Sequence, residues 1–322
     1  MKTAELGGLQ RQEKESRTAA RRSKIRVKIR QNYELYLFML PAVIIYLVFK
    51  YYPMYGVQIA FKDFRASKGI WGSEWVGFEH FIRFFEAYNF WPIMENTILL
   101  SLYSLVFGFP IPIIVALMLN QMLAKRYKKF VQTVIYAPHF ISTVVLVGML
   151  GVFLSPNSGI VNHIIAFFGG EPVLFMASEG WFRPLYVLSG IWQETGFATI
   201  IYLAALAGVN PELHEAAVMD GASKWKRVKH VDLPSIMPTI IILMVLALGN
   251  VMSVGFEKAY LMQSDLNYAA SNIIPTYVYE LGIQKAQYSF SAAIGLFNAI
   301  INVVLLVTVN RAAKRLTETS LW

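Results

Sequence analysis

The chain has 322 residues, of which 56% are hydrophobic and 15% are charged, and its net charge is +9. A soluble domain typically has about a quarter of its residues charged, so this composition excludes an ordinary soluble domain. The lack of cysteine excludes disulfide bonds and thiolate metal ligands. Residues 96–124, 130–170, 235–256 and 286–310 contain no Asp, Glu, Lys or Arg. Apolar runs of ~18 or more residues are long enough to cross a bilayer as helices, so the sequence predicts an integral membrane protein.

The first 33 residues are polar and basic, and they contain no apolar stretch that ends in a small-residue cleavage site. We therefore expect no cleaved signal peptide, and the first apolar helix is itself the membrane anchor. Residues 17–30 are expected to be mobile or to form an interfacial helix. The predicted organisation is a basic segment 1–33, a membrane domain 34–310 and a tail 311–322.

Six membrane-spanning helices are predicted, because lipid-exposed backbone must satisfy its own hydrogen bonds. The first is short and contains Pro41, and Lys50 with the tyrosines after it would extend the helix by reaching the interface. The six expected spans are Glu34–Phe49, Ile93–Met122, Val131–Leu154, Pro184–Val209, Ser235–Gly255 and Ser289–Asn310.

The basic residues predict the orientation of these spans. Ten Lys and Arg precede the first span, four lie between the second and third, four between the fourth and fifth, and three after the sixth, so 21 of the 29 lie on one side. Cytoplasmic loops carry the excess of Lys and Arg, so both termini are expected in the cytoplasm. The positive charge also raises the possibility of nucleic-acid binding. Because the charges flank apolar spans, however, we expect contact with anionic lipid head groups and no nucleic-acid partner.

On the opposite side, the segment Tyr51–Trp91 is rich in aromatic residues and too short for an independent domain. Aromatic side chains favour the membrane boundary, so a short interfacial helix is expected near Phe78–Phe85.

The loop Asn210–Pro234 is predicted to be a helical hairpin on the cytoplasmic surface. Asn210 can cap a helix, and Pro211 is well suited to the first position of that helix. Gly221 permits a sharp change of direction, and Ser223 can cap a second short helix, Lys224–His230, which ends at Leu233-Pro234. The residues alone leave two interpretations open: a surface that docks against another protein, or a loop that only connects two spans.

This loop resembles the EAA loop of permease subunits in binding-protein-dependent ABC importers. The family pattern is Glu-Ala-Ala, three residues, Gly, nine residues, Ile, any residue, Leu-Pro. Glu215-Ala216-Ala217, Gly221 and Leu233-Pro234 stand at that spacing, and Val231 replaces the Ile. Three further segments, 49–64, 76–85 and 190–206, resemble the sugar-permease branch that includes the larger (MalF-like) subunit of the maltose permease and the LplB-like permeases.

The resemblance implies an all-α fold of six transmembrane helices, the type I permease fold of ABC importers, in the bacterial cytoplasmic (inner) membrane. In this family the loop contains a coupling helix that sits in a cleft of the ATPase subunit. The resemblance further implies three partners: a second homologous permease subunit, a nucleotide-binding ATPase dimer and an extracytoplasmic solute-binding protein. By position in the pattern, the expected coupling residues are Glu215, Ala216, Ala217, Asp220, Gly221, Ala222, Leu233 and Pro234.

The sequence lacks the common motifs for nucleotide binding and for hydrolase catalysis. No Gly-x-x-x-x-Gly-Lys-Ser/Thr segment is present, so ATP and Mg²⁺ are expected on a partner ATPase, with no cofactor on this chain. The sequence has no Gly-x-Ser-x-Gly elbow, and its histidines are widely separated, so we expect neither a catalytic site nor a metal site.

Polar residues inside the predicted spans are candidates for a substrate pathway, because their burial in lipid is costly. Sugars need aromatic stacking surfaces and amide or hydroxyl groups, and this set supplies both. Each residue alone also fits packing between helices, and Trp192 fits an interfacial anchor. The candidates are Trp192, Gln193, Glu194, Tyr202, Asn250, Ser253, Asn298 and Asn302.

The resulting hypothesis is a permease subunit that moves a carbohydrate, expected to be an oligosaccharide, from a solute-binding protein into the cytoplasm. ATP-driven closure of the ATPase dimer would switch it between inward-open and outward-open states. One alternative is an ion- or proton-coupled secondary transporter that uses Glu194 and needs no ATP. Another is a membrane interaction protein without transport activity.

Overall fold

The structure is a computed structural model that describes residues 31–317 and 320–321. It divides into two compact units, Met1–Gln58 and Ile59–Trp322, which we call the N-terminal unit and the main unit. The interfacial helix considered for residues 17–30 lies outside the described residues.

The first predicted span is longer than expected. Its segments follow one another without a break as α2 (Tyr33–Tyr46), a π-helical turn (Leu47–Tyr51), α3 (Tyr52–Met54) and a 3₁₀ turn (Tyr55–Phe61). Together they form a 29-residue apolar helix, Tyr33–Phe61, instead of Glu34–Phe49. Pro41 is accommodated inside α2, and the π-helical turn carries Lys50 and leads into Pro53 near the start of α3.

The main unit begins with small elements that precede its long helices. A two-residue antiparallel pair joins β1 (Lys62–Asp63) to β2 (Glu74–Trp75) around α4 (Gly69–Gly72). The following helix, α5 (Glu79–Glu86), confirms the short helix expected near Phe78–Phe85.

The second span is formed by α6 (Phe90–Tyr103), a π-helical turn (Ser104–Gly108) and α7 (Pro110–Asn120). The third, expected as one helix over Val131–Leu154, is broken. It consists of α8 (Lys125–Tyr136) with a 3₁₀ turn (Ala137–Phe140), followed by α9 (Thr143–Phe153) at an angle of 98°. Pro138 lies in that turn, Ile141 is extended, and the Ser142 hydroxyl caps α9 by accepting a bond from the Val145 N–H.

After α10 (Ile160–Phe167) and a 3₁₀ turn (Phe175–Ala177), the fourth span is α11 (Glu179–Ala207). It bends by 73° into α12 (Pro211–Met219). The expected break at Leu233-Pro234 is absent. Instead, α13 (Lys224–Arg227), a π-helical turn (Val228–Asp232) and α14 (Leu233–Gly249) form one helix, Lys224–Gly249, which begins before and ends before the predicted Ser235–Gly255. Pro234 has no N–H to donate within this helix, and the π-helical turn Val228–Asp232 directly before α14 adjusts the hydrogen-bond pattern at that point.

Three short helices, α15 (Phe256–Met262), α16 (Tyr268–Ser271) and α17 (Ile274–Tyr279), and a π-helical turn (Glu280–Gln284) lead to α18 (Tyr288–Thr317). The last helix extends beyond the predicted Ser289–Asn310 into the expected tail. In the described residues, four helices are long and apolar enough to cross a membrane, or up to six if each bent pair is one span.

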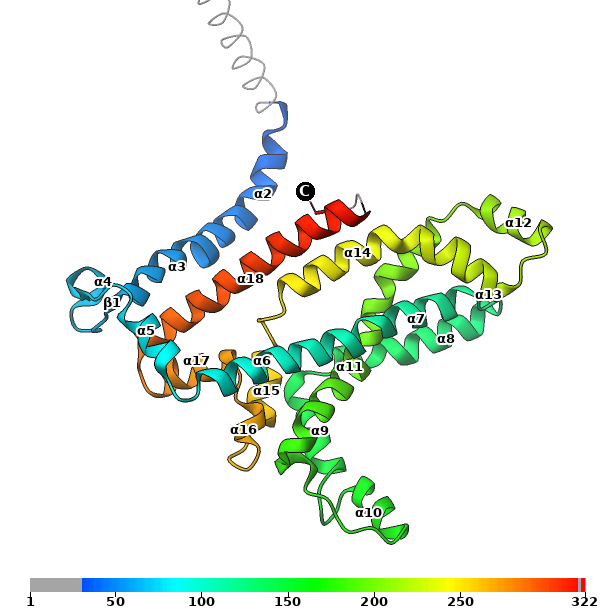
Figure 1. Cartoon of the computed structure of the whole chain (residues 1–322). Helices are drawn as coiled ribbons and strands as arrows, with labels where there is room; N and C mark the ends of the chain where they lie inside the picture. Colours follow the sequence, from blue (N-terminus) through cyan, green and yellow to red (C-terminus); the bar gives the residue numbers. More distant parts are fainter. Residues whose placement is uncertain (1–30, 318–319, 322) are drawn as a thin grey trace, which may run out of the picture. The chain divides into compact units, whose positions relative to one another are not determined.

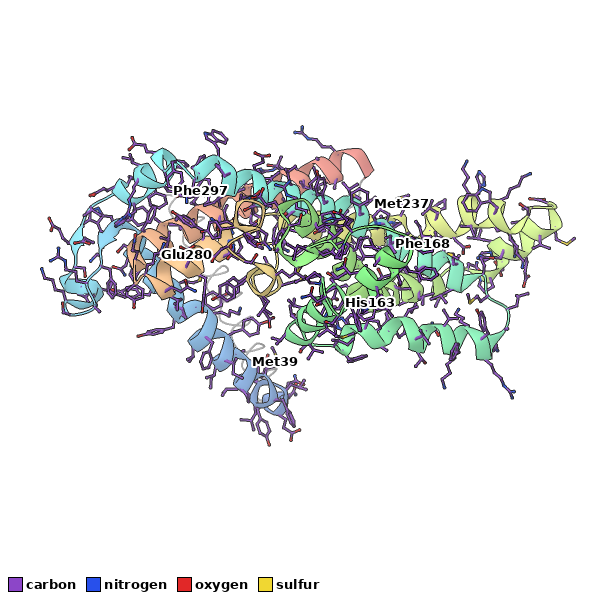
Figure 2. The ribbon with its side chains drawn as sticks, turned by 90° about the horizontal axis from the view of Figure 1, so that it is seen from below. Met39, His163, Phe168, Met237, Glu280 and Phe297 are labelled. Atoms are coloured by element: carbon purple, nitrogen blue, oxygen red, sulfur yellow. The ribbon has the colours of Figure 1, made fainter. Side chains whose placement is uncertain are left out.

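The core of the main unit lies where these helices meet. Helix α14 runs beside α18, and α11 packs on α7 (Figure 1). Around Phe297 of α18, labelled in Figure 2, the rings of Phe84 and Phe85 have centroids 5.6 and 5.3 Å away. A separate cluster joins Tyr202 and Leu206 of α11 to Ile236 and Ile240 of α14. These contacts bring α11 and α14 together beside the cavity described below.

Candidate functional site: the 210–234 hairpin and the cavities between the helices

The loop Asn210–Pro234 folds as the predicted hairpin in its first half. The Asn210 side-chain oxygen accepts a hydrogen bond from the Glu212 N–H at 3.1 Å, and Pro211 occupies the first turn of α12. At the other end, the Ala222 N–H donates to Ala217 O at 2.9 Å and the Gly221 N–H donates to Val218 O at 3.0 Å. This pair of bonds is the Schellman closure of a helix.

Gly221 has a φ of +73°, in the left-handed region that side chains disfavour. The space around it is open, so the backbone conformation and not crowding requires glycine here. The sharp turn expected at Gly221 is thus present.

The hairpin exposes apolar side chains together with charges of both signs. The side chain of Met219 is 87% exposed and that of Trp225 74% exposed. Of the expected coupling residues, Glu215, Ala216, Asp220, Gly221 and Pro234 are exposed, whereas Ala217, Ala222 and Leu233 are half-buried. Exposed apolar residues grouped in this way are typical of protein-interaction surfaces. At the base of the hairpin, Asp232 is fully buried, a feature that the sequence pattern does not reveal.

A cavity of about 420 Å³ lies between α7, α11 and α14. Its wall contains Tyr186, Glu194 and Tyr202 of α11, which the helix presents on one side. The Glu194 carboxylate lies within hydrogen-bond distance of His139 Nδ1, at 2.9 Å, and the His139 ring stacks on Phe197 with centroids 4.0 Å apart. Glu194 therefore connects the cavity wall with the break between α8 and α9.

A second cavity of about 330 Å³ adjoins the first, with which it shares Ser104 and Tyr186. Its wall includes Ser101, Asn250 and Ser253, and it is more polar than the first cavity. The structure thus brings four of the predicted pathway residues, Glu194, Tyr202, Asn250 and Ser253, to two neighbouring cavities.

The other pathway candidates have different surroundings. Gln193 is buried and donates to Ile141 O at 2.8 Å, so it holds the break between α8 and α9. Asn302 donates to Ser253 Oγ at 2.9 Å and accepts from the Met252 N–H. Trp192 is 49% exposed, and the side-chain oxygen of Asn298 is buried without a hydrogen-bond partner. None of these four is among the residues that line the two cavities.

Sequence reasoning missed Tyr186 and Lys258. Tyr186 lines both cavities, and Lys258 Nζ donates to its backbone carbonyl at 2.8 Å and lies 4.7 Å from its ring centroid. Lys258 is buried although it stands in a short helix outside the predicted spans. The run Gly255-Phe256-Glu257-Lys258 gives no periodic signal that would have placed it against α11.

A polar cluster ties α16 to the turn after α17. The Tyr268 hydroxyl donates to one Glu280 oxygen at 2.7 Å, and Lys285 Nζ donates to the other at 2.6 Å. Burial acts to raise the pKa of Glu280, but the bonds from Lys285 and Tyr268 outweigh it and hold that pKa below its usual range. Burial, followed by the hydrogen bond to Glu280, raises the pKa of Tyr268. Glu280 is therefore ionised near neutral pH and links α16 to the turn after α17 through its two hydrogen bonds.

Comparison with known proteins identifies the family. The family described as "binding-protein-dependent transport system inner membrane component" matches residues 108–318, a range that contains the complete hairpin. The chain belongs to this family. This is a family of transport permeases and not of catalytic proteins. The chain is a multi-pass protein of the inner membrane.

Relatives along nearly the full length agree. The chain is 44% identical over 302 residues to the polygalacturonan/rhamnogalacturonan transport system permease protein YteP of Bacillus subtilis, covering 94% of each protein. It is 43% identical over 288 residues to protein LplB of the same organism, covering 89% of this chain and 91% of LplB. The expected kinship with the LplB-like permeases is thus confirmed.

A solved structure confirms the fold. One chain of a bacterial alginate ABC transporter, in complex with an alginate pentasaccharide-bound periplasmic protein, superposes with a TM-score of 0.84 at 41% identity. The match covers 91% of this chain and 98% of that chain. The chain therefore has the all-α type I permease fold of ABC importers, as predicted.

Proposed function

We propose that the chain is one of two permease subunits in an ATP-driven importer, and that it carries an oligosaccharide received from an extracytoplasmic solute-binding protein into the cytoplasm. The observation that carries the proposal is the exposed hairpin with Glu215, Gly221 and Pro234 at the EAA spacing, in a chain of the matching family. The carbohydrate substrate is supported by the relatives, whose names refer to transport of polygalacturonan and rhamnogalacturonan and of alginate. Both termini and the hairpin would lie on the cytoplasmic side, because that side carries most of the basic residues.

In this proposal α12 is the coupling helix and enters a cleft of the partner ATPase. The small side chains of Ala216 and Ala217 allow close approach of the backbone. The exposed Leu213, Val218 and Met219 supply apolar area for the contact. ATP and Mg²⁺ would bind to the partner alone, and closure of the ATPase dimer would move α12 and switch the permease between its two states.

The two adjoining cavities are the proposed part of the substrate pathway on this chain. Tyr186 and Tyr202 offer aromatic faces, and Asn250, Ser253 and Ser104 offer hydrogen-bonding groups. A saccharide combines apolar ring faces with hydroxyl groups, so it needs both kinds of contact. The second permease would complete the walls.

The test is reconstitution of the chain in liposomes with its second permease, the ATPase and the binding protein. We expect uptake of a labelled oligosaccharide that requires ATP on the ATPase side and the binding protein on the other side. Uptake by this chain alone, driven by an ion gradient, would establish the secondary transporter instead. If binding protein and saccharide never stimulate ATP hydrolysis and no uptake occurs, the chain is not an importer subunit.

Exchange of Glu194 for Gln separates the importer from the secondary transporter. Glutamine can still accept a hydrogen bond from His139, although a bond to a charged group is roughly twice as strong. We therefore expect ATP-dependent uptake to fall by less than tenfold and to be insensitive to an ionophore that collapses the proton gradient. Complete loss of uptake, or a requirement for the gradient in the unaltered protein, would contradict this expectation.

A further inference from the structure

The base of the hairpin contains a carboxylate that is shielded from solvent. Asp232 has an exposed fraction of 0% and is the one buried carboxylate in the part of the chain that the structure describes. A buried charge is costly unless hydrogen bonds and an opposite charge satisfy it. Its surroundings therefore show what keeps it in place.

Three side chains surround Asp232. The Asn120 amide donates to Oδ1 at 3.2 Å and the Gln121 amide donates to Oδ2 at 2.8 Å. His214 Nε2 lies 3.2 Å from Oδ1, and its ring is 25% exposed. Of the three, only His214 can carry a positive charge.

These groups come from three separate elements. Asn120 is the last residue of α7 and Gln121 caps it, whereas His214 belongs to α12 and Asp232 immediately precedes α14. Figure 1 shows α12, α13 and the end of α7 at the same end of the main unit. One carboxylate thus connects the hairpin with two of the long helices.

The local backbone is arranged around this residue. Asp232 is the last residue of the π-helical turn Val228–Asp232, and such turns often occur at functional sites. Trp225 and Lys226 of α13 are exposed, whereas Asp232 at the end of the turn is buried. The Ser235 hydroxyl donates to Val231 O at 2.7 Å and satisfies one of the carbonyls near the turn.

The contact between His214 and Asp232 is the polar interaction that joins α12 to the helix bundle. Within the described residues, the other hydrogen bonds of α12 stay inside the hairpin, as with the Asn210 cap and the closure by Ala222. His214 is half-buried on the helix side opposite the exposed Glu212, Ala216 and Met219. The outer side of α12 is therefore available to a partner while the inner side contacts Asp232.

We propose that Asp232 is a positioning residue that fastens α12 through His214 to the ends of α7 and α14, so that movement of α12 is transmitted to both helices. This role rests on the proposed function, in which the ATPase moves α12. It concerns the transfer of motion and not the binding of the ATPase, which in the proposed function uses the exposed residues of α12.

The contact can be tested on the full chain without any partner. Because the sequence has no cysteine, Met219→Cys provides a single site for a spin label on the exposed side of α12. His214→Gln keeps an N–H donor, whereas His214→Leu has similar size but no donor. We expect the label to become at least twofold more mobile with His214→Leu and to stay unchanged with His214→Gln. Equal mobility in the two variants would overturn the proposed tie.

Transfer of motion is tested in the reconstituted importer by the number of ATP molecules hydrolysed per saccharide taken up. We expect this ratio to rise at least fivefold with His214→Leu and with Asp232→Asn, and to stay within twofold with His214→Gln. A ratio unchanged in both His214→Leu and Asp232→Asn would overturn the role of Asp232. If Asp232→Asn does not assemble, the two His214 variants decide alone.

The two measurements also separate this inference from the proposed function. Absence of ATP-driven uptake with the unaltered chain would contradict the proposed function, while the label result would still decide whether His214 and Asp232 hold α12. Normal uptake with unchanged ratios in all variants would leave the proposed function intact and refute the inference.

Discussion

Reversal of the charge at Glu215 is expected to abolish coupled transport. Glu215 lies on α12 with an exposed side chain, at the first position of the EAA pattern. In the proposed docking of α12 against an ATPase, a lysine would replace a carboxylate at the interface, and misplaced like charges at an interface cost several kcal/mol. We therefore expect Glu215→Lys to lower uptake by at least a hundredfold, because every ~1.4 kcal/mol is a factor of ten in affinity. The measurements are uptake, stimulated ATP hydrolysis and co-purification of the ATPase.

The control is Glu171→Lys, which makes the same change at an exposed glutamate between α10 and α11, outside the hairpin. This variant should retain uptake within twofold of the unaltered chain. If Glu215→Lys supports normal uptake and normal stimulated hydrolysis, α12 is not the coupling helix. An equal loss in the two variants would show that charge reversal acts through folding or insertion.

The second large effect is expected from Gly196→Ala in α11. A Cβ atom at Gly196 would overlap the backbone carbonyl of Ile135 in α8. Backbone atoms cannot move aside as a flexible side chain can, so α8 and α11 would have to separate. Overpacking of this kind typically costs about 1–3 kcal/mol or more, and here it also disturbs the nearby Gln193 bond to Ile141 O. We expect a large fall in the thermal unfolding temperature and in the amount of folded protein in the membrane.

Gly151→Ala is the matched control, because a Cβ atom at Gly151 in α9 meets no atom within 4 Å. Alanine favours helix by about 1 kcal/mol over glycine, so this variant should be as stable as the unaltered chain or slightly more stable. Equal unfolding temperatures for the two variants would show that α8 and α11 do not touch at Gly196. Unfolding in detergent, followed by the fluorescence of the seven tryptophans, provides the measurement.

The positions of the spans were predictable wherever apolar composition alone decides. Long uncharged runs predicted the span formed by α6 and α7 and the spans α14 and α18, because a bilayer selects helices by length and hydrophobicity. Breaks within helices were not predictable in the same way. Pro138 coincides with the bend between α8 and α9, whereas Pro234 lies in a helix that continues. The difference depends on neighbours such as Gln193, which holds the Ile141 carbonyl, and these contacts are formed by residues distant in the sequence.

The candidate sites likewise include parts that could be predicted from the sequence and parts that could not. The hairpin is a local structure, so Asn210 as its cap and Gly221 as its turn could be inferred from residue type and spacing. The cavity residues depend on which faces of α7, α11 and α14 meet. Accordingly, Glu194 and Tyr202 were found from polarity within a span, whereas Gln193 and Asn302 have structural contacts that polarity cannot distinguish from a pathway role.

The sequence by itself determined that the chain is an all-α membrane protein whose 210–234 hairpin has the residue spacing of the importer-permease family. These properties follow from composition and from spacing over a few helical turns. Only the tertiary structure decided that Asp232 is buried against Asn120, Gln121 and His214, and that Lys258 lies against Tyr186. The physical reason is that burial of a charge depends on partners brought together by packing, and those partners stand up to 112 residues apart in the chain.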